Sequence, residues 1–258
     1  MLGATSPEAA GSDTGVDTMQ RRRKIIHTRR TVTGLALVAA ISFVAGMTDA
    51  VGLIRFGDFV SFMTGNTTRA ALDFAGGNYS HALVLFVALW VFILGNALGI
   101  VIAHTVSARR AFVVLASVSV LLGIAASLPA NLPRVAFFLV VLAMGAINAT
   151  VEHIQGLPIG LTYVTGALSR FGRGIGRWLV GDRNPTGWLI QCVPWTGMAG
   201  GALSGAFLTR YAPDFALWVV SLVALTVALV TAFLPRPLQL HFQQPIKPAG
   251  RPLPRSRP

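Results

Sequence analysis

A short polar segment in an otherwise apolar stretch of the sequence has the composition of a helix that starts inside a membrane. In Thr64-Gly65-Asn66-Thr67, the glycine permits a backbone break, and Asn66 or Thr67 can cap the exposed N–H groups. A helix that begins within a bilayer directs free N–H groups and the positive end of its dipole toward the midplane. Irregular backbone is tolerated there only when it is buried in protein or lines a polar cavity. The segment is therefore a candidate binding site for an anionic or polar solute; alternatively, its small residues only let helices pack closely.

The same pattern recurs farther along the chain. Residues 60–69 align without gaps on residues 161–170, an offset of 101 positions (170 − 69). The residues that recur are Thr64, Gly65 and Arg69, as Thr165, Gly166 and Arg170. Two breaks at equivalent positions of inverted halves are a usual sequence sign of a transporter's substrate site. We therefore predict an internal duplication with a candidate binding segment in each half.

Arg69 and Arg170 follow their breaks by about one helical turn. An arginine inside a membrane is costly enough to count as functional by default, and here it would recognise an anion. The alternative is an arginine at a membrane interface whose charged head extends to the lipid headgroups. That alternative is stronger for Arg170, which has basic neighbours at Arg173, Arg177 and Arg183.

Two acidic residues, Asp49 and Glu152, lie within apolar runs. Either carboxylate could pair with one of these arginines or take up a proton during transport, so both are candidates for coupling or gating. The alternative for Asp49 is a buried ion pair that fixes helix packing. Near the end of the same run, Arg55 and Asp58 stand three residues apart, and we expect a local surface pair there.

The sequence predicts no enzyme, no metal site and no cofactor. The single cysteine, Cys192, excludes a disulfide within the chain, and the histidines show no ligand spacing. Phosphate-loop and Gly-x-Ser-x-Gly nucleophile motifs are absent. The glycine-rich run of residues 197–205 has small residues at helical spacing, which indicates close helix packing.

The elements that position these residues are predicted to be membrane-spanning helices. Of the 258 residues, 53% are hydrophobic and only 12% are charged, and the mean hydropathy is +0.65. A soluble domain typically has about a quarter of its residues charged, whereas a span needs about twenty apolar residues. Six runs meet that length, and they cover residues 33–54, 81–104, 111–130, 135–154, 188–209 and 215–234. Two shorter segments, 59–74 and 160–175, are predicted to be weak spans or re-entrant elements.

The distribution of basic residues favours one topology. The formal net charge of +12 is concentrated before the first run and after the last, which is typical of membrane flanks rather than of nucleic-acid binding. Six spans with a cytoplasmic N-terminus keep Arg109, Arg110, the cluster at 170–183 and both tails inside. We therefore predict an all-α protein of six spans, in two inverted three-span halves at about 33–130 and 134–234, each with a short or re-entrant helix. Eight spans with a parallel repeat are the alternative.

The regions outside the spans are predicted to be tails. Residues 1–30 are expected to be a disordered basic tail, residues 31–234 the transmembrane domain, and residues 235–258 a proline-rich basic cytoplasmic tail. A start at Met19 in place of Met1 would remove most of the first tail.

The residues from Ala45 to Arg69 resemble the YoaK-like family of bacterial membrane proteins, a domain of unknown function with about six predicted spans. The resemblance rests on Ala-Gly-Met-Thr-Asp followed by Met-Thr-Gly-Asn-Thr-Thr-Arg, and it covers about residues 33–235. The family-like positions that it marks are Asp49, Thr64, Gly65, Asn66, Thr67 and Arg69. The resemblance implies a bacterial inner membrane location and no particular substrate.

These observations favour a secondary transporter or small channel for an anionic or polar small solute. Backbone N–H groups at Gly65–Thr67 and Arg69 would bind the solute, and Asp49 would act in gating or proton coupling. The alternative is a non-transporting accessory or assembly protein whose polar residues only pack helices. The expected partners are the lipid bilayer and an unknown solute, with no nucleic acid, and the sequence does not indicate an oligomeric state. A transporter should have a polar cavity lined by Asp49, Asn66 and Arg69, whereas the alternative should bury them in satisfied pairs.

Overall fold

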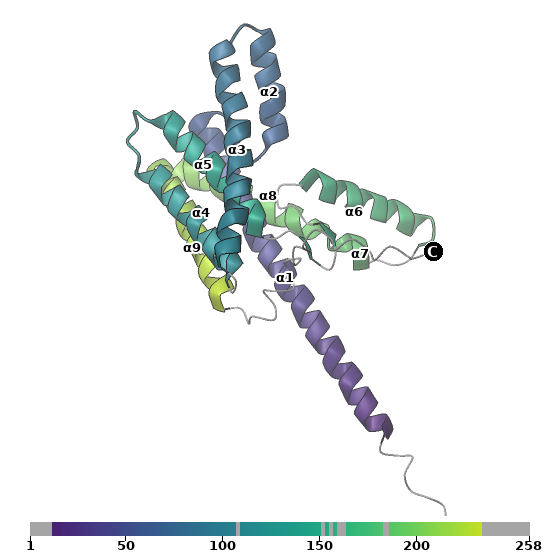
Figure 1. Cartoon of the computed structure of the whole chain (residues 1–258). Coiled ribbons are helices and arrows are strands. Elements are labelled where there is room, and N and C mark those ends of the chain that lie inside the picture. The colour runs from purple at the N-terminus through teal and green to yellow at the C-terminus, as the bar shows by residue number, and fades with distance from the viewer. Residues whose placement is uncertain are drawn as a thin grey trace, which may run out of the picture.

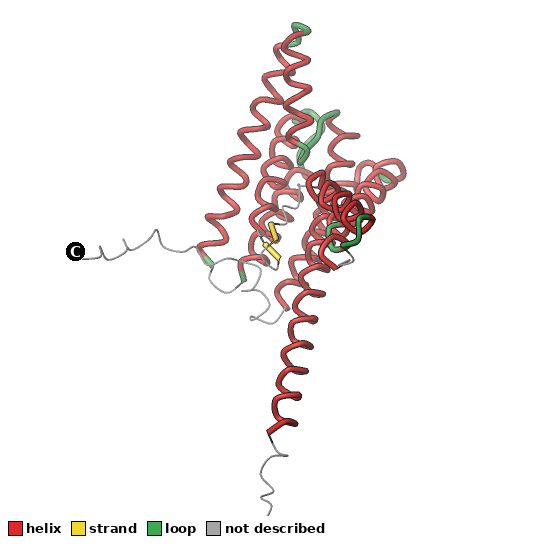
Figure 2. The backbone as a smooth tube through the Cα atoms, turned by 90° about the vertical axis from the view of Figure 1, so that its right-hand side faces the viewer, coloured by secondary structure: helices red, strands yellow, loops and turns green. Residues whose placement is uncertain are grey.

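A computed structural model describes residues 12–106, 109–150, 153–154, 157–158, 164–182 and 186–233, and within these ranges the chain is helical (Figure 1). The α-helices are α1 (Ser12–Phe56), α2 (Met63–Ala75), α3 (Tyr79–Thr105), α4 (Arg110–Ser127), α5 (Pro133–Ile147), α6 (Val164–Leu179), α7 (Thr186–Leu189), α8 (Cys192–Tyr211) and α9 (Ala216–Phe233). Short 3-10 turns occur at η1 (Asn148–Thr150) and η2 (Pro213–Phe215). One antiparallel pair of two-residue strands joins β1 (His153–Ile154) to β2 (Leu157–Pro158). The predicted helical class is therefore confirmed, with only a trace of strand (Figure 2).

Five segments within the described ranges are long and apolar enough to cross a membrane. They are Val32–Phe56, Tyr79–Thr105, Arg110–Ser127, Pro133–Thr150 and Pro213–Phe233, and each coincides with one predicted run. The remaining predicted run, 188–209, which is the fifth along the chain, corresponds largely to α8, which has the length of a span but is less apolar because of its glycines and Pro194. α1 begins at Ser12, within the predicted N-terminal tail, and the tail predicted at 235–258 lies outside the described residues.

α8 packs closely against the second half of α1, and the two helices run in the same direction. A Cβ atom on Gly197 would lie 2.6 Å from the carbonyl oxygen of Ala39, and one on Gly205 would lie 2.5 Å from that of Met47. Residue numbers therefore increase together along the two helices. Glycine at these positions lets two backbones touch, which is the usual way in which helices associate tightly in a bilayer.

α3 and α5 form a second parallel pair of the same kind. A Cβ atom on Gly95 would lie 2.3 Å from the carbonyl oxygen of Leu142, and one on Gly99 would lie 2.7 Å from that of Ala146. These glycines are four residues apart, as are Gly197, Gly201 and Gly205 of α8, all three of which meet carbonyl oxygens of α1. Close packing through glycine thus occurs twice in the bundle, between α1 and α8 and between α3 and α5.

α4 and α9 pack antiparallel through two serines. The Ser119 hydroxyl donates to the carbonyl oxygen of Ser221, the Ser221 hydroxyl donates to that of Ser119, and both distances are 2.8 Å. Gly123 follows Ser119 by one turn of α4, and it lies near Trp218, which precedes Ser221 by about one turn of α9. The two helices therefore run in opposite directions. Both hydroxyls are satisfied inside the protein, as polar groups between membrane helices must be.

The hydrophobic core lies where α1, α4, α5 and α9 meet. Its fully buried large side chains include Ile41, Leu115, Leu122, Met144 and Leu217. By contrast, α3 presents many apolar residues on its outer face, including the exposed Leu83 and Trp90. An exposed apolar helix face of this length is suited to lipid rather than water.

Candidate functional site

The chain between α1 and α2 folds back along α1 instead of continuing away from it. Gly57 has a φ of +82°, a conformation that glycine adopts without strain, and it reverses the chain directly after Phe56. The returning loop lies directly on α1, because a Cβ atom on Gly52 would be only 2.6 Å from a methyl carbon of Val60. α2 therefore begins, at Met63, shortly after the loop has returned to α1.

Asp49 anchors this loop, residues 57–62, at its deepest point. Its Oδ1 atom accepts hydrogen bonds from the backbone N–H groups of Val60 and Ser61, both at 2.9 Å, and its Oδ2 atom accepts from the Ser61 hydroxyl at 2.5 Å. The residue is only 6% exposed. A carboxylate that accepts from several donors in a buried site is strongly held. Asp49 thus binds N–H groups of the loop that leads into α2, whereas the anion was predicted at the N–H groups of Gly65–Thr67, which lie within α2.

Asn66 and Arg69 hold the other end of the same loop. The Asn66 side-chain amide donates to the carbonyl oxygen of Phe59 at 2.6 Å, and the Arg69 guanidinium donates to that of Gly57 at 2.6 Å. Arg69 also lies 3.2 Å from a carboxylate oxygen of Asp58. Three of the residues that the sequence singled out in this half, Asp49, Asn66 and Arg69, therefore lie together and fix the α1–α2 loop.

The other family-like positions of α2 have different surroundings. Gly65 lies under Phe62, because a Cβ atom there would be 2.4 Å from that ring. Thr64 and Thr67 are exposed, and the Thr67 hydroxyl donates back to the carbonyl oxygen of Met63 at 2.8 Å. The two threonines therefore lie on the outer face of α2, away from the contacts that hold the loop.

In the second half, the corresponding residues have other partners. Thr165 is exposed, Gly166 is partly buried in the first turn of α6, and the Arg170 guanidinium donates to the side-chain oxygen of Gln191 at 2.8 Å. Arg170 is thus bound to the start of α8, whereas Arg69 is bound to the preceding loop. Glu152, the second candidate for coupling, lies outside the described residues.

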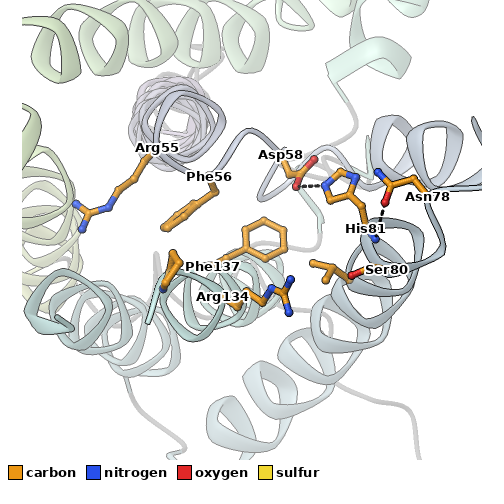
Figure 3. Close-up of a pocket in the computed structure, with 10 residues that line it drawn as sticks. Arg55, Phe56, Asp58, Asn78, Ser80, His81, Arg134 and Phe137 are labelled. Carbon is orange, nitrogen blue, oxygen red and sulfur yellow. Dashed lines mark hydrogen bonds and ion pairs between the residues drawn. The ribbon is translucent and has the colours of Figure 1, made fainter. Parts of the chain in front are cut away.

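A pocket of about 410 Å³ opens next to the α1–α2 loop (Figure 3). It lies between the end of α1 and the beginnings of α3 and α5. The residues that line it are Arg55, Phe56, Asp58, Asn78, Ser80, His81, Val84, Pro133, Arg134 and Phe137. Its volume is in the range of small-molecule sites. Asp49, Asn66 and Arg69, which hold the loop, do not line this pocket. Asp58, which belongs to the loop, does.

The acidic residue that lines this pocket, Asp58, is already paired. The two ring nitrogens of His81 lie 2.9 Å from a carboxylate oxygen of Asp58 and 2.7 Å from one of Asp73. A neutral imidazole has a single N–H group, so donation to both carboxylates requires the protonated ring. With Arg69 also beside Asp58, two cationic groups face two carboxylates.

Two further cations of the pocket, Arg55 and Arg134, have no carboxylate partner in the part of the chain that the structure describes. In Figure 3, Arg134 extends beside Phe137 toward Ser80, whereas Arg55 extends to the far side of Phe56. The residues that line the pocket therefore carry more positive than negative charge, because Asp58 is the single carboxylate among them. A guanidinium is well suited to bind carboxylate or phosphate groups.

The predicted surface pair between Arg55 and Asp58 is wrong, because Asp58 pairs with His81 and Arg69 instead. The fold-back of the loop turns Asp58 away from Arg55, which three-residue spacing alone does not reveal. Neither His81 nor Arg134 was predicted from the sequence to belong to a site. One signal was present: Arg55, Arg69 and Arg134 are basic residues that the six-span topology leaves outside or part-way into the membrane, where orientation does not require them.

Comparison with known proteins now places the chain. Residues 37–230 match the model of a family described as "Protein of unknown function (DUF1275)". A UPF0700 transmembrane protein from Rhizobium meliloti (strain 1021) is 55% identical over 227 residues, which is 88% of this chain and 99% of the relative. No solved structure matches. The resemblance inferred from Ala45–Arg69 is confirmed, and the chain belongs to the DUF1275 family of transmembrane proteins of unknown function.

Proposed function

We propose that the protein is a secondary transporter or small channel for a small anionic solute, and that the pocket beside the α1–α2 loop is the outer part of the solute's path. The observation that carries this proposal is a pocket of about 410 Å³ lined by two arginines, Arg55 and Arg134, that have no carboxylate partner among the described residues. The Arg134 guanidinium extends toward Ser80, whereas that of Arg55 lies on the far side of Phe56 (Figure 3). A site of this volume and charge fits a small carboxylate, phosphate or sulfate.

The directions of the helices support a six-span arrangement with inverted halves. With the N-terminus in the cytoplasm, α1 and the parallel α8 run outward, and α9, joined to α8 by a short turn, runs inward. α4 is antiparallel to α9 and runs outward, so α5 and the parallel α3 run inward. The first half is then out, in, out and the second in, out, in, which is a common transporter construction. In this arrangement α8 is a span, the fifth along the chain, both termini are cytoplasmic, and the membrane is the bacterial inner membrane.

Within this proposal, Asp49, Asn66 and Arg69 act on the solute indirectly. They hold the loop that presents Asp58 to the pocket, and Asp58 in turn binds His81. A coupling role for Asp49 would require its hydrogen bonds to the loop to break and re-form during transport. The alternative of a non-transporting accessory protein is favoured by the complete pairing of Asp49 within the chain.

Arg134→Gln is expected to abolish the stabilisation of the purified protein by its anion. A ligand that binds only the folded state stabilises it by about 2.7 kcal/mol at a hundredfold excess over Kd, which raises the midpoint of thermal unfolding by several degrees. Inorganic phosphate, sulfate and small mono- and dicarboxylates are the probes, and the midpoint is measured in detergent. We expect one of them to shift the wild type in a dose-dependent way and to leave Arg134→Gln unshifted.

Arg210→Gln is the matched control, because Arg210 is an exposed arginine at the end of α8 and does not line the pocket. It should keep the full ligand shift, and the same anion should enter proteoliposomes that contain either the wild type or this control. If an anion binds at the pocket but no flux is detected, the protein binds the anion without transporting it. If no probe shifts the wild type, or Arg134→Gln is shifted equally, the anion pocket is refuted.

A further inference from the structure

α6 has two contrasting faces. In Figure 1 it extends from the bundle on the right, across the direction of α3. Its arginines, Arg170, Arg173 and Arg177, are spaced three and four residues apart and therefore share one face, and the helix contains no acidic residue. The apolar residues fall on the other face, as in helices that lie at the surface of a membrane.

The protein covers only one side of the apolar face of α6. A Cβ atom on Gly174 would lie 2.1 Å from the Cβ of Trp188, and the ring of Phe171 packs on the same tryptophan with 5.4 Å between ring centroids. This contact fixes α6 against the segment that leads into α8. The neighbouring apolar edge is open: Ile175 is 37% exposed and Leu179 is 71% exposed. The described part of the chain therefore does not shield this apolar edge from water, and a different molecule would have to do so.

The positive charge of α6 is not neutralised by the described chain. Arg170 donates to Gln191 and Arg173 donates to the Ser169 hydroxyl at 3.1 Å, so both partners are uncharged. Within the described ranges, no carboxylate pairs with Arg170, Arg173 or Arg177. An open apolar edge beside a row of unneutralised arginines is complementary to the boundary between acyl chains and anionic headgroups.

We infer that α6 is a lipid-binding helix that lies in the headgroup region of one leaflet, with Ile175 and Leu179 on the acyl chains and Arg173 and Arg177 on the headgroups of anionic phospholipids. By the positive-inside rule this is the cytoplasmic leaflet. A second copy of the chain is a poorer occupant, because it would bring a second row of arginines against the first. The segment 160–175 was predicted to be a weak span or a re-entrant element, and this placement differs from both, since either would bring the arginine face into the membrane.

Depth measurement tests the placement directly. Nitroxide labels are attached at Ile175→Cys, on the open apolar edge, and at Gly176→Cys, on the polar side, in a Cys192→Ser background. A Cβ atom on Gly176 meets nothing within 4 Å, so the chain tolerates a label there. In vesicles of phosphatidylcholine mixed with phosphatidylglycerol, we expect the label at 175 to lie at the headgroup–acyl boundary. The label at 176 should be accessible to a water-soluble paramagnetic relaxation agent. Two deep labels would indicate a crossing helix, and two labels shielded from both lipid and water would indicate a protein partner; either result overturns the inference.

Lipid selectivity tests the role of charge. The double variant Arg173→Gln/Arg177→Gln should reduce the preference for spin-labelled phosphatidylglycerol over phosphatidylcholine by about tenfold or more, since each basic group near an anionic surface contributes to binding. Arg210→Gln, which removes a positive charge elsewhere on the protein, should leave the preference nearly unchanged. An equal preference in the double variant and the wild type would refute the headgroup contact. Neither experiment depends on whether the protein transports an anion.

Discussion

Gly201→Ala is expected to disrupt the contact between α1 and α8, whereas Gly200→Ala, one residue earlier, should leave it intact. A Cβ atom on Gly201 would lie 2.0 Å from the carbonyl oxygen of Phe43 and 2.9 Å from its Cα atom. Because these are backbone atoms of a long helix, they cannot move aside cheaply. On Gly200 the added carbon would lie 3.8 Å from the Phe43 ring, an ordinary contact distance.

The two substitutions should change the free energy of unfolding in opposite directions. Overpacking a tight contact costs about 1–3 kcal/mol and sometimes more, so Gly201→Ala should lower the free energy of unfolding by at least that amount. Gly200→Ala should be neutral or stabilising by up to about 1 kcal/mol, because alanine favours a helix more than glycine does. Thermal unfolding in detergent, followed with a thiol dye on the single Cys192, measures both. Equal stability of the two variants would mean that α1 and α8 are not held together at this glycine.

The spans were predictable because their signal is local. Each of five helices coincides with an apolar run of the required length, and neither a partner helix nor a turn is needed to recognise such a run. α8 shows the opposite case. The glycines that let it touch α1 at Ala39 and Met47 also lower its hydropathy, so the feature that secures its packing weakens the signal of a span.

The contacts of the candidate site were predictable only in part. The importance of Asp49, Asn66 and Arg69 followed from residue types that are costly in an apolar run. That all three bind one loop did not follow, because the loop reverses at Gly57 and returns to Gly52, a path that no periodicity encodes. The predicted break at Gly65, capped by Asn66 or Thr67, is wrong: Gly65 lies inside α2, which begins at Met63, and both side chains donate to carbonyl oxygens instead of capping N–H groups. The prediction that Asp49 lines a cavity stays a prediction, since the described pocket begins at Asp58 and Arg55 instead.

The pocket itself could not be read from spacing. Its charged residues come from the end of α1, the beginning of α3 and the beginning of α5, which are far apart in the sequence. Arg134 is one residue into α5 and reads as an ordinary flanking residue of a span. Only the packing of α5 beside α3, through Gly95 and Leu142, brings it to the same pocket as His81.

Asp49→Leu is expected to be among the most destabilising single substitutions outside the glycine contacts. Leucine would leave the N–H groups of Val60 and Ser61 and the Ser61 hydroxyl without an acceptor in a buried site. An unsatisfied buried polar group costs about 1–3 kcal/mol, so the three together should lower the free energy of unfolding by about 3 kcal/mol or more. The measurement is thermal or denaturant unfolding of the purified protein in detergent.

Asp49→Asn separates the role of hydrogen bonding from that of charge. The amide oxygen of asparagine can still accept from both backbone N–H groups, and the Ser61 hydroxyl can rotate to accept from the amide N–H. We therefore expect Asp49→Asn to lose only about 1 kcal/mol, and the exposed Asp214→Asn to lose nothing measurable. If Asp49→Leu were as stable as the wild type, the carboxylate would not be holding the loop. If Asp49→Asn kept its stability but lost anion flux, the negative charge itself would be required for transport, because the loop that presents Asp58 would still be held in place.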